Sequence, residues 1–315
     1  MLQFHQKREF VVKKDIDWLG VGALVVAMMV WASSFVALKS AIGPLGPMSV
    51  IFGRMLFASL CFVYFIKQFT KLSFTKKDLK YIAVMTLFEP CMYFIFEAKA
   101  LQNTSAAQAG IITSMMPLIT AVGAGFILKE VITKRVILGA VLAVMGAIWL
   151  SLSASSDANA INPLLGNTLE FLAMICGAGY AISARHLSAK FSPLFLTAIQ
   201  AFVGAIFFLP FAIYEYNTME MHITQSAFLW TLYLGVVVTL GGYGMFNFAL
   251  GRIEASKASV FINLIPIFAV IAAYILLGER LKFVQFLASG VILTGLFISQ
   301  APIHRLRQLY SFLRK

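Results

Sequence analysis

A charged side chain within a long apolar segment needs a specific reason, and three such residues are candidates for chemistry. They are Arg54, Glu89 and Glu97. If these segments cross a bilayer, each charge costs at least about 2.5–3.5 kcal/mol on insertion scales, so it requires a partner or a water-filled cavity. The helical rise places Arg54 and Glu89 at similar depths. We therefore expect an Arg54–Glu89 ion pair, which is either part of a transport site or a fixed salt bridge between two helices.

Glu89 and Glu97 can face one cavity, because eight residues along a helix correspond to a rotation of only about 80° between them. Two carboxylates in a cavity of low dielectric constant suit the binding and release of a proton, or the binding of a cationic group. Alternatively, Glu97 lies in the headgroup region beside Lys99. The functional argument is therefore stronger for Glu89.

Further polar and aromatic side chains are candidates for the lining of the same cavity, and aromatic faces can bind a cation. These candidates are Trp31, Tyr93, Tyr180, Tyr243 and Asn247. Because 14% of the chain is aromatic, helix packing or lipid contact is the alternative for each ring. The glycines between 241 and 244 indicate either close helix packing or a locally unwound helix that lines a cavity.

The sequence contains no pattern typical of a metal centre, a cofactor site or an enzyme. The histidines fall in loops or tails, at His5, His186, His222 and His304. The cysteines fall within apolar segments without metal-ligand spacing, at Cys61, Cys91 and Cys176. The phosphate-binding GxxxxGK[ST], the GxSxG and the HExxH motifs are absent from the sequence. We expect no cofactor, no metal and no catalytic activity.

The elements that carry these residues are predicted to be membrane-spanning helices. The chain of 315 residues is 60% hydrophobic and 12% charged, with a mean hydropathy of +0.88. A soluble domain contains roughly 25% charged residues. A span needs about 20 apolar residues, and ten segments qualify, near 18–38, 47–66, 81–101, 105–128, 136–153, 168–184, 193–214, 227–250, 257–277 and 283–300.

The net charge of +12 is explained by topology rather than by nucleic-acid binding. Most of the 25 Lys and Arg residues fall in alternate connections, near 7–14, 67–80, 129–135, 185–190, 252–257 and 305–315. The positive-inside rule assigns these segments to the cytoplasm, together with both termini. The first apolar run is of full spanning length, so we interpret it as the first helix and not as a signal peptide.

The chain contains an internal repeat. Residues 100–150 align without a gap on residues 249–299, and the matches include Pro117 with Pro266 and Glu130 with Glu279. Each half has five spans, so the second half enters the membrane from the opposite side and the repeats are inverted. The expected division is a tail at 1–17, a first repeat at 18–153, a connecting loop at 154–167, a second repeat at 168–300 and a tail at 301–315. The recurring Glu130 and Glu279 are predicted to be structural helix caps.

Residues that both repeats share are expected to form the scaffold, whereas polar residues that occur in one repeat only are candidates for function. The mismatched pairs are Glu89 with Val238, Glu97 with Phe246, Asn247 with Ala98 and, in the earlier part of each half, Arg54 with Gln200. This asymmetry is the reason for selecting these residues.

Several of these features together resemble the drug/metabolite transporter superfamily, specifically proteins with two EamA domains. They are the segment from Trp31 to Lys39, the arginine at position 54 and the repeated late motif around Pro117 and Pro266. The resemblance implies an inner-membrane carrier of ten helices, with a central cavity between two halves and both ends in the cytoplasm. Substrates in that superfamily range over amino acids, sugars, nucleotide-linked metabolites, amines and drugs.

We therefore expect an all-α secondary-active transporter that moves a small polar or amphipathic metabolite by alternating access, such as an amino acid, an amine or a drug-like molecule. The resemblance favours export, and a proton gradient is the simplest energy source. The expected partners are the small-molecule substrate, the proton and the lipid bilayer, without nucleic acid, and a homodimer is allowed. The alternative is a membrane sensor or scaffold that transports nothing.

Overall fold

The computed structural model describes residues 17–70, 72–127, 132–156, 160–250, 252 and 261–300. These residues form helices and no strand element, as the sequence predicts. The first half comprises α1 (Trp18–Leu45), α2 (Pro47–Val63), α3 (Ile66–Phe69), α4 (Lys76–Thr86), η1 (Leu87–Met92), α5 (Tyr93–Asn103), α6 (Ala106–Thr113), α7 (Met116–Ile127) and α8 (Lys134–Ser153). The second comprises α9 (Pro163–Leu187), α10 (Pro193–Thr218), α11 (Gln225–Tyr233), η2 (Leu234–Gly242), α12 (Tyr243–Leu250), η3 (Ile262–Leu264), α14 (Ile265–Leu277) and α15 (Phe283–Gln300).

The helices start where the sequence supplies caps. Side-chain oxygens at the N-caps accept backbone N–H groups that would otherwise have no partner. These residues are Asp17, Thr75, Ser105, Thr133, Asn162, Ser192 and Thr224. Thr75 also forms a reciprocal capping box with Asp78 at the start of α4.

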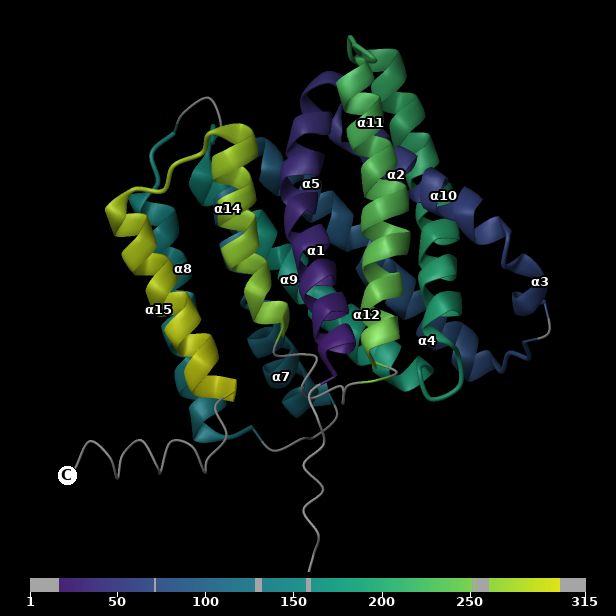
Figure 1. The fold of residues 1–315 in the computed structure, drawn as a ribbon, viewed down its shortest axis with the longest axis horizontal. Coiled ribbons are helices and arrows are strands. Elements are labelled where there is room, and N and C mark those ends of the chain that lie inside the picture. The colour runs from purple at the N-terminus through teal and green to yellow at the C-terminus, as the bar shows by residue number, and fades with distance from the viewer. Residues whose placement is uncertain are drawn as a thin grey trace, which may run out of the picture.

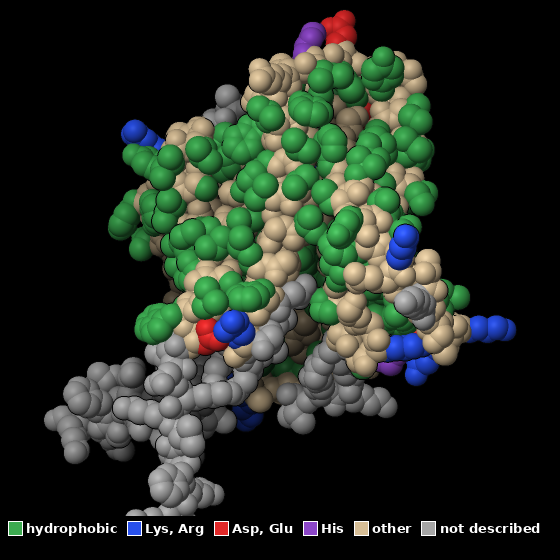
Figure 2. Space-filling view, turned by 45° about the vertical axis from the view of Figure 1, so that its right-hand side comes forward, with side chains coloured by type: hydrophobic (Ala, Val, Ile, Leu, Met, Phe, Trp, Pro, Cys, Tyr) green, Lys and Arg blue, Asp and Glu red, His purple; other side chains and the backbone are tan. Residues whose placement is uncertain are grey.

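The described part of the chain contains seven helical segments that are long and apolar enough to cross a membrane. Three shorter apolar helices, Pro47–Val63, Ile262–Leu277 and Phe283–Ser299, coincide with the second, ninth and tenth predicted spans. Figure 2 shows hydrophobic side chains over most of the middle of one face of the bundle, with charged groups towards its margins. The arrangement of ten spans as inverted repeats stays a prediction.

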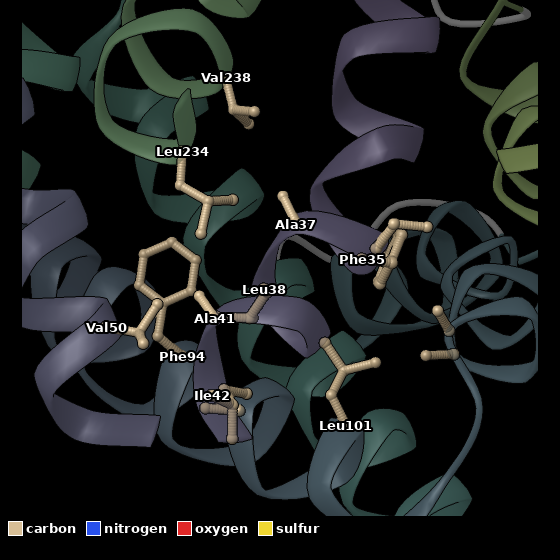
Figure 3. Close-up of a cluster of buried hydrophobic side chains, with 14 of the residues drawn as sticks. Phe35, Ala37, Leu38, Ala41, Ile42, Val50, Phe94, Leu101, Leu234 and Val238 are labelled. Carbon is tan, nitrogen blue, oxygen red and sulfur yellow. The ribbon is translucent and has the colours of Figure 1, made fainter. Parts of the chain in front are cut away.

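The helices form a bundle in which α1 lies centrally, against α14, α12, α11 and η2 (Figure 1). Its buried face contributes Phe35, Ala37, Leu38 and Ala41 to the largest apolar cluster (Figure 3). Phe94 of α5 and Leu234 of η2 belong to the same cluster, so side chains from both halves of the chain fill it.

At one edge of the bundle, α8 and α15 lie side by side, at the left of Figure 1. A Cβ atom built on Gly139 would lie 2.4 Å from the carbonyl oxygen of Gly295. Small residues permit this close approach of two backbones in lipid, where van der Waals packing drives the association of helices.

Two wide helical turns interrupt the spans that carry the candidate residues. η1 joins α4 to α5, and η2 joins α11 to α12. The two turns overlap when the repeats are aligned, so each half has the same interruption at the same place. Gly241 and Gly242 lie at the end of η2, which shows that this glycine segment belongs to an altered helix and not only to close packing. Such wide turns occur frequently at functional sites.

Candidate functional site

Arg54 and Glu89 line one small cavity, about 20 Å³ in volume, which is room for about one water molecule. Its walls come from α2, η1, α5, α10, η2 and α12, so both halves of the chain contribute. The other lining residues are Met55, Pro90, Phe94, Thr197, Gln200, Ala201, Thr239 and Tyr243. The sequence correctly places Arg54, Glu89 and Tyr243 together, and Gln200, the repeat counterpart of Arg54, joins them.

The side chain of Arg54 is buried and has two partners in this cavity. Its Nε donates a hydrogen bond to Thr239 Oγ1 at 3.3 Å, and its guanidinium carbon lies 4.4 Å from the centre of the Phe94 ring. The second contact is a cation–π interaction. The buried positive charge of Arg54 is therefore stabilised by the Thr239 hydroxyl and by the face of the Phe94 ring.

The direct Arg54–Glu89 ion pair that we expected is not formed: among the described residues, the ion pairs within 4.0 Å do not include it. The reason is the direction of the Arg54 side chain, which reaches Thr239 and Phe94 instead. The two charges still interact electrostatically across the cavity.

Glu89 lies where the helix is broken. Its φ of −144° and ψ of 118° are extended values within η1, and Pro90 follows it. The break frees the Glu89 carbonyl oxygen, which accepts a hydrogen bond from Gln200 Nε2 at 3.1 Å. The Tyr243 hydroxyl donates to Glu89 Oε1 at 3.4 Å. Two residues of the second half, Gln200 and Tyr243, therefore bind the backbone and the carboxylate of Glu89.

Glu97 lies in the protein interior. Its exposed fraction is 4%, which excludes the alternative that it points into the headgroup region. The Tyr93 hydroxyl donates to Glu97 Oε1 at 3.1 Å. Glu97 Oε2 has no hydrogen-bond partner.

The aromatic candidates surround this region in different ways. Trp31 packs against Tyr243, with ring centroids 5.2 Å apart. The position of Gly242 suits glycine, because a Cβ atom on this residue would lie 2.5 Å from the indole nitrogen of Trp31. Tyr180 is half-buried and interacts electrostatically with Glu89, although it is not part of the cavity wall. The side chain of Asn247 lies outside what the structure describes.

Glu170 of α9, which is not among the candidates predicted from the sequence, is completely buried. Thr113 Oγ1 donates to Glu170 Oε1 at 3.2 Å, while Glu170 Oε2 has no partner. The asymmetry of the repeats could have found this residue, because its counterpart in the first half, Leu24, is apolar. The charge of Glu170 interacts with that of Glu97.

Another buried carboxylate, that of Glu279, has a clear structural role. Glu279 accepts the backbone N–H groups of Ala106 and Ala107, each at 3.0 Å, and forms an ion pair of 3.8 Å with Lys39. Capping by Glu279 is therefore confirmed, and the helix that it caps is α6 of the other half. Its predicted equivalent, Glu130, lies outside the described residues.

Comparison with known proteins decides the family. The profile of the EamA-like transporter family matches residues 18–152 and 164–300. The chain belongs to this family. The resemblance inferred from the sequence motifs is confirmed, and this EamA-like transporter is a multi-pass membrane protein.

Relatives of this EamA-like transporter occur in bacteria and archaea. It is 28% identical over 227 residues to the uncharacterized transporter YetK of Bacillus subtilis (strain 168), covering 71% of this chain and 69% of YetK. It is 26% identical over 277 residues to an uncharacterized transporter of Archaeoglobus fulgidus, covering 87% and 96% of the two chains. It is also 25% identical over 289 residues to a protein of Escherichia coli (strain K12) named "Probable amino-acid metabolite efflux pump", covering 89% and 94%.

The fold is also found in a solved structure. A chain titled "Crystal structure of protein" superposes with a TM-score of 0.60 at 15% sequence identity, covering 89% of this chain and 96% of that one. At this identity the likeness shows the fold alone.

Proposed function

We propose that this EamA-like transporter is a secondary-active carrier that exports a small polar or amphipathic metabolite across the inner membrane by alternating access, with both termini in the cytoplasm. The observation that carries the proposal is the pair of opposite charges, Arg54 and Glu89, on the wall of one cavity to which both halves contribute. Buried charge in a membrane span is costly and is typical of substrate or ion pathways.

Within the range of small metabolites, the geometry favours an amino acid or a similar zwitterion. The Arg54 guanidinium can bind a carboxylate, and the Glu89 carboxylate can bind an ammonium group. Tyr243 and Trp31 provide aromatic faces beside Glu89. The name of the Escherichia coli relative points to the same class of cargo.

Alternating access is part of the proposal because the cavity is too small for a metabolite. A volume of about 20 Å³ accommodates about one water molecule. Cargo binding therefore requires the two halves to move apart, as in other carriers built from repeats. The interrupted helices η1 and η2 provide the altered backbone beside the site.

Energy coupling is assigned to Glu89, with Glu97 assisting. In this scheme the Glu89 carboxylate exchanges a proton for the cationic group of the cargo, so that the two cannot be bound at the same time. The proton and the cargo are then transported across the membrane in opposite directions.

The test is a thermal-shift screen of the purified protein with three related probes: an amino acid, the amine that lacks its carboxylate and the acid that lacks its ammonium group. A ligand that binds the folded state raises the melting temperature by mass action. The amino acid should give the largest shift in the wild type. Arg54→Ala should reduce the shift in melting temperature that the amino acid produces and should not change the shift that the amine produces. Glu89→Gln should reduce both shifts.

The matched control is Glu220→Gln, because Glu220 is an exposed carboxylate in the connection between α10 and α11. This variant should keep the wild-type response to all probes. If Arg54→Ala responds to the amino acid as the wild type does, the zwitterion assignment is wrong. If the amino acid binds to wild-type proteoliposomes but is never transported, the chain is a sensor rather than a carrier.

A further inference from the structure

Glu97 and Glu170 form a second polar site between α5 and α9. Their exposed fractions are 4% and 0%, respectively. The two helices approach each other through small residues of α9: a Cβ on Gly177 would lie 3.5 Å from the Tyr93 ring, and one on Gly166 would lie 2.6 Å from the Thr104 backbone nitrogen. This packing brings the two carboxylates into electrostatic interaction with each other.

Each carboxylate uses only one of its two oxygens. Tyr93 donates to Glu97 Oε1 at 3.1 Å, and Thr113 donates to Glu170 Oε1 at 3.2 Å. Both Oε2 atoms are buried without a hydrogen-bond partner, and the ion pairs of the described residues include neither carboxylate. A buried carboxylate that keeps its charge under these conditions is strongly unfavourable, so such groups are paired or neutralised by a proton.

The surrounding charges do not neutralise the pair. The positive charge of Arg54 interacts electrostatically with Glu97, and the same charge also interacts with Glu89. One positive charge thus faces three carboxylates in this part of the described structure. The titratable groups on α5, on α9 and on the elements packed against them, besides the pair itself, are Lys39 (α1), Arg54 and Cys61 (α2), Lys76, Lys77, Asp78, Lys80 and Tyr81 (α4), Glu89 and Cys91 (η1), Tyr93 and Lys99 (α5), Lys134 and Arg135 (α8), and Cys176, Tyr180, Arg185 and His186 (α9).

We propose that Glu97 and Glu170 bind one proton between them and form a proton-binding site separate from the Arg54–Glu89 cavity. In the proposed state the protonated carboxyl donates a hydrogen bond from its Oε2 to the Oε2 of the ionised carboxylate, so that a single proton satisfies both unpartnered oxygens. The shared proton also removes one of the two negative charges. No covalent bond other than O–H forms or breaks, and the proton comes from and returns to water.

The site deepens the proposed function, and its coupling role rests on that function. The charge of Glu97 acts on Glu89. Loss of the shared proton therefore adds negative potential at the cargo cavity and strengthens the binding of a cationic group there. In this scheme Glu97 pairs with Glu170 and acts on Glu89 only through space.

Infrared spectroscopy of the full-length protein in liposomes tests the site without any cargo. The carbonyl stretch of a protonated carboxyl is followed as the pH is varied, for the wild type, Glu97→Gln, Glu170→Gln and the double variant. Glu89 contributes a band of its own, which is identified as the band that Glu89→Gln removes. Apart from it, we expect one band in the wild type, a band with a changed wavenumber and pH midpoint in each single variant, and no such band in the double variant. Size-exclusion elution and melting temperature establish that each variant is folded.

The matched control is Glu215→Gln, because Glu215 is a buried carboxylate whose two oxygens both accept backbone N–H groups, from Met48 and Ser49. This variant should keep the wild-type band. A band that is not removed by Glu89→Gln and that persists in the double variant, or that one single variant leaves unchanged in wavenumber and midpoint, overturns the shared site. A band that disappears when sodium ions are added at constant pH assigns the site to a metal cation instead and also overturns it.

Transport measurements test the coupling role of Glu97 and Glu170 separately. In proteoliposomes, the amino acid with the largest thermal shift should still undergo counterflow in the double variant, but an imposed pH gradient should drive less accumulation than in the wild type, because only Glu89 remains to exchange a proton. Gradient-driven accumulation at the wild-type level would overturn the coupling role. If the wild type transports nothing, the proposed function fails while the infrared result still decides whether the proton site exists.

Discussion

The Glu279 carboxylate lies across the start of α6, with Oε1 3.0 Å from the backbone nitrogen of Ala106. The first turn of a helix has N–H groups without intrahelical partners and a partial positive charge, so a carboxylate stabilises it. Glu215, at the end of α10, does the same for Met48 and Ser49 at the start of α2. Two carboxylates of the second half thus hold the N-termini of two helices of the first half.

Replacing Glu279 by Gln should lower the melting temperature of the detergent-solubilised protein. The amide keeps one acceptor oxygen but loses the charge and the second hydrogen bond, and a hydrogen bond to a charged group contributes about 1.5–3 kcal/mol. Glu220→Gln, which changes an exposed carboxylate, serves as the control and should melt at the wild-type temperature. Equal melting temperatures for the two variants would contradict the role of Glu279.

The packing of α8 on α15 can be tested with two alanine substitutions on the same helix. Gly295→Ala should lower the melting temperature, because its Cβ would lie 2.5 Å from the carbonyl oxygen of Gly139 and the helices must separate. Gly290→Ala should be neutral or stabilising, since a Cβ there meets nothing within 4 Å and alanine favours a helix. If both variants melt alike, the two helices do not pack through Gly139 and Gly295.

Reporter fusions test the topology. The charge distribution and the inverted repeats place fusions at Asp157 and Glu220 outside the cell, and fusions after Lys76 and Lys190 inside. A reporter that is active only in the cytoplasm and one that is active only outside should give opposite patterns at each site. Reversal at any one of them would remove the inverted-repeat argument.

Much of the fold could be predicted because the bilayer imposes a length on each apolar segment. The helical segments and the connections between them follow from that length and from the internal repeat. The glycines between 241 and 244 indicated a locally unwound helix as one of two alternatives, but the wide turns η1 and η2 depend on the packing of neighbouring helices. Sequence spacing does not contain that information.

The site could be predicted less completely. Depth along a helix correctly suggested that Arg54 and Glu89 lie near each other, but the rotamer that turns Arg54 towards Thr239 and Phe94 depends on η2 and α5. Glu170 was missed because the asymmetry argument was applied to the second, third and eighth spans and not to the sixth. Its pairing with Glu97 depends on the approach of α5 to α9, which no local pattern shows.

A double-mutant cycle measures the interaction between Arg54 and Glu89. Arg54→Ala removes the cation that shares the cavity with Glu89, and Glu89→Ala removes the negative charge that shares it with Arg54, so each should lower the melting temperature. The double variant should be less impaired than the sum, and residues that share a cavity or a charge network show couplings of about 0.5–3 kcal/mol. Strict additivity would mean that the two charges act independently.

Glu89→Gln separates binding from coupling. The amide keeps the shape and hydrogen-bonding capacity of the side chain but cannot exchange a proton, so proton-driven transport should stop while cargo binding survives in weakened form. For a cargo with a cationic group, binding to the wild type should weaken as the pH falls, because a protonated Glu89 no longer attracts it. The measurement is uptake and counterflow in proteoliposomes with an imposed pH gradient, comparing the wild type with the variant. If the variant still concentrates its cargo in response to that gradient, Glu89 is a structural charge, and proton coupling depends on other carboxylates.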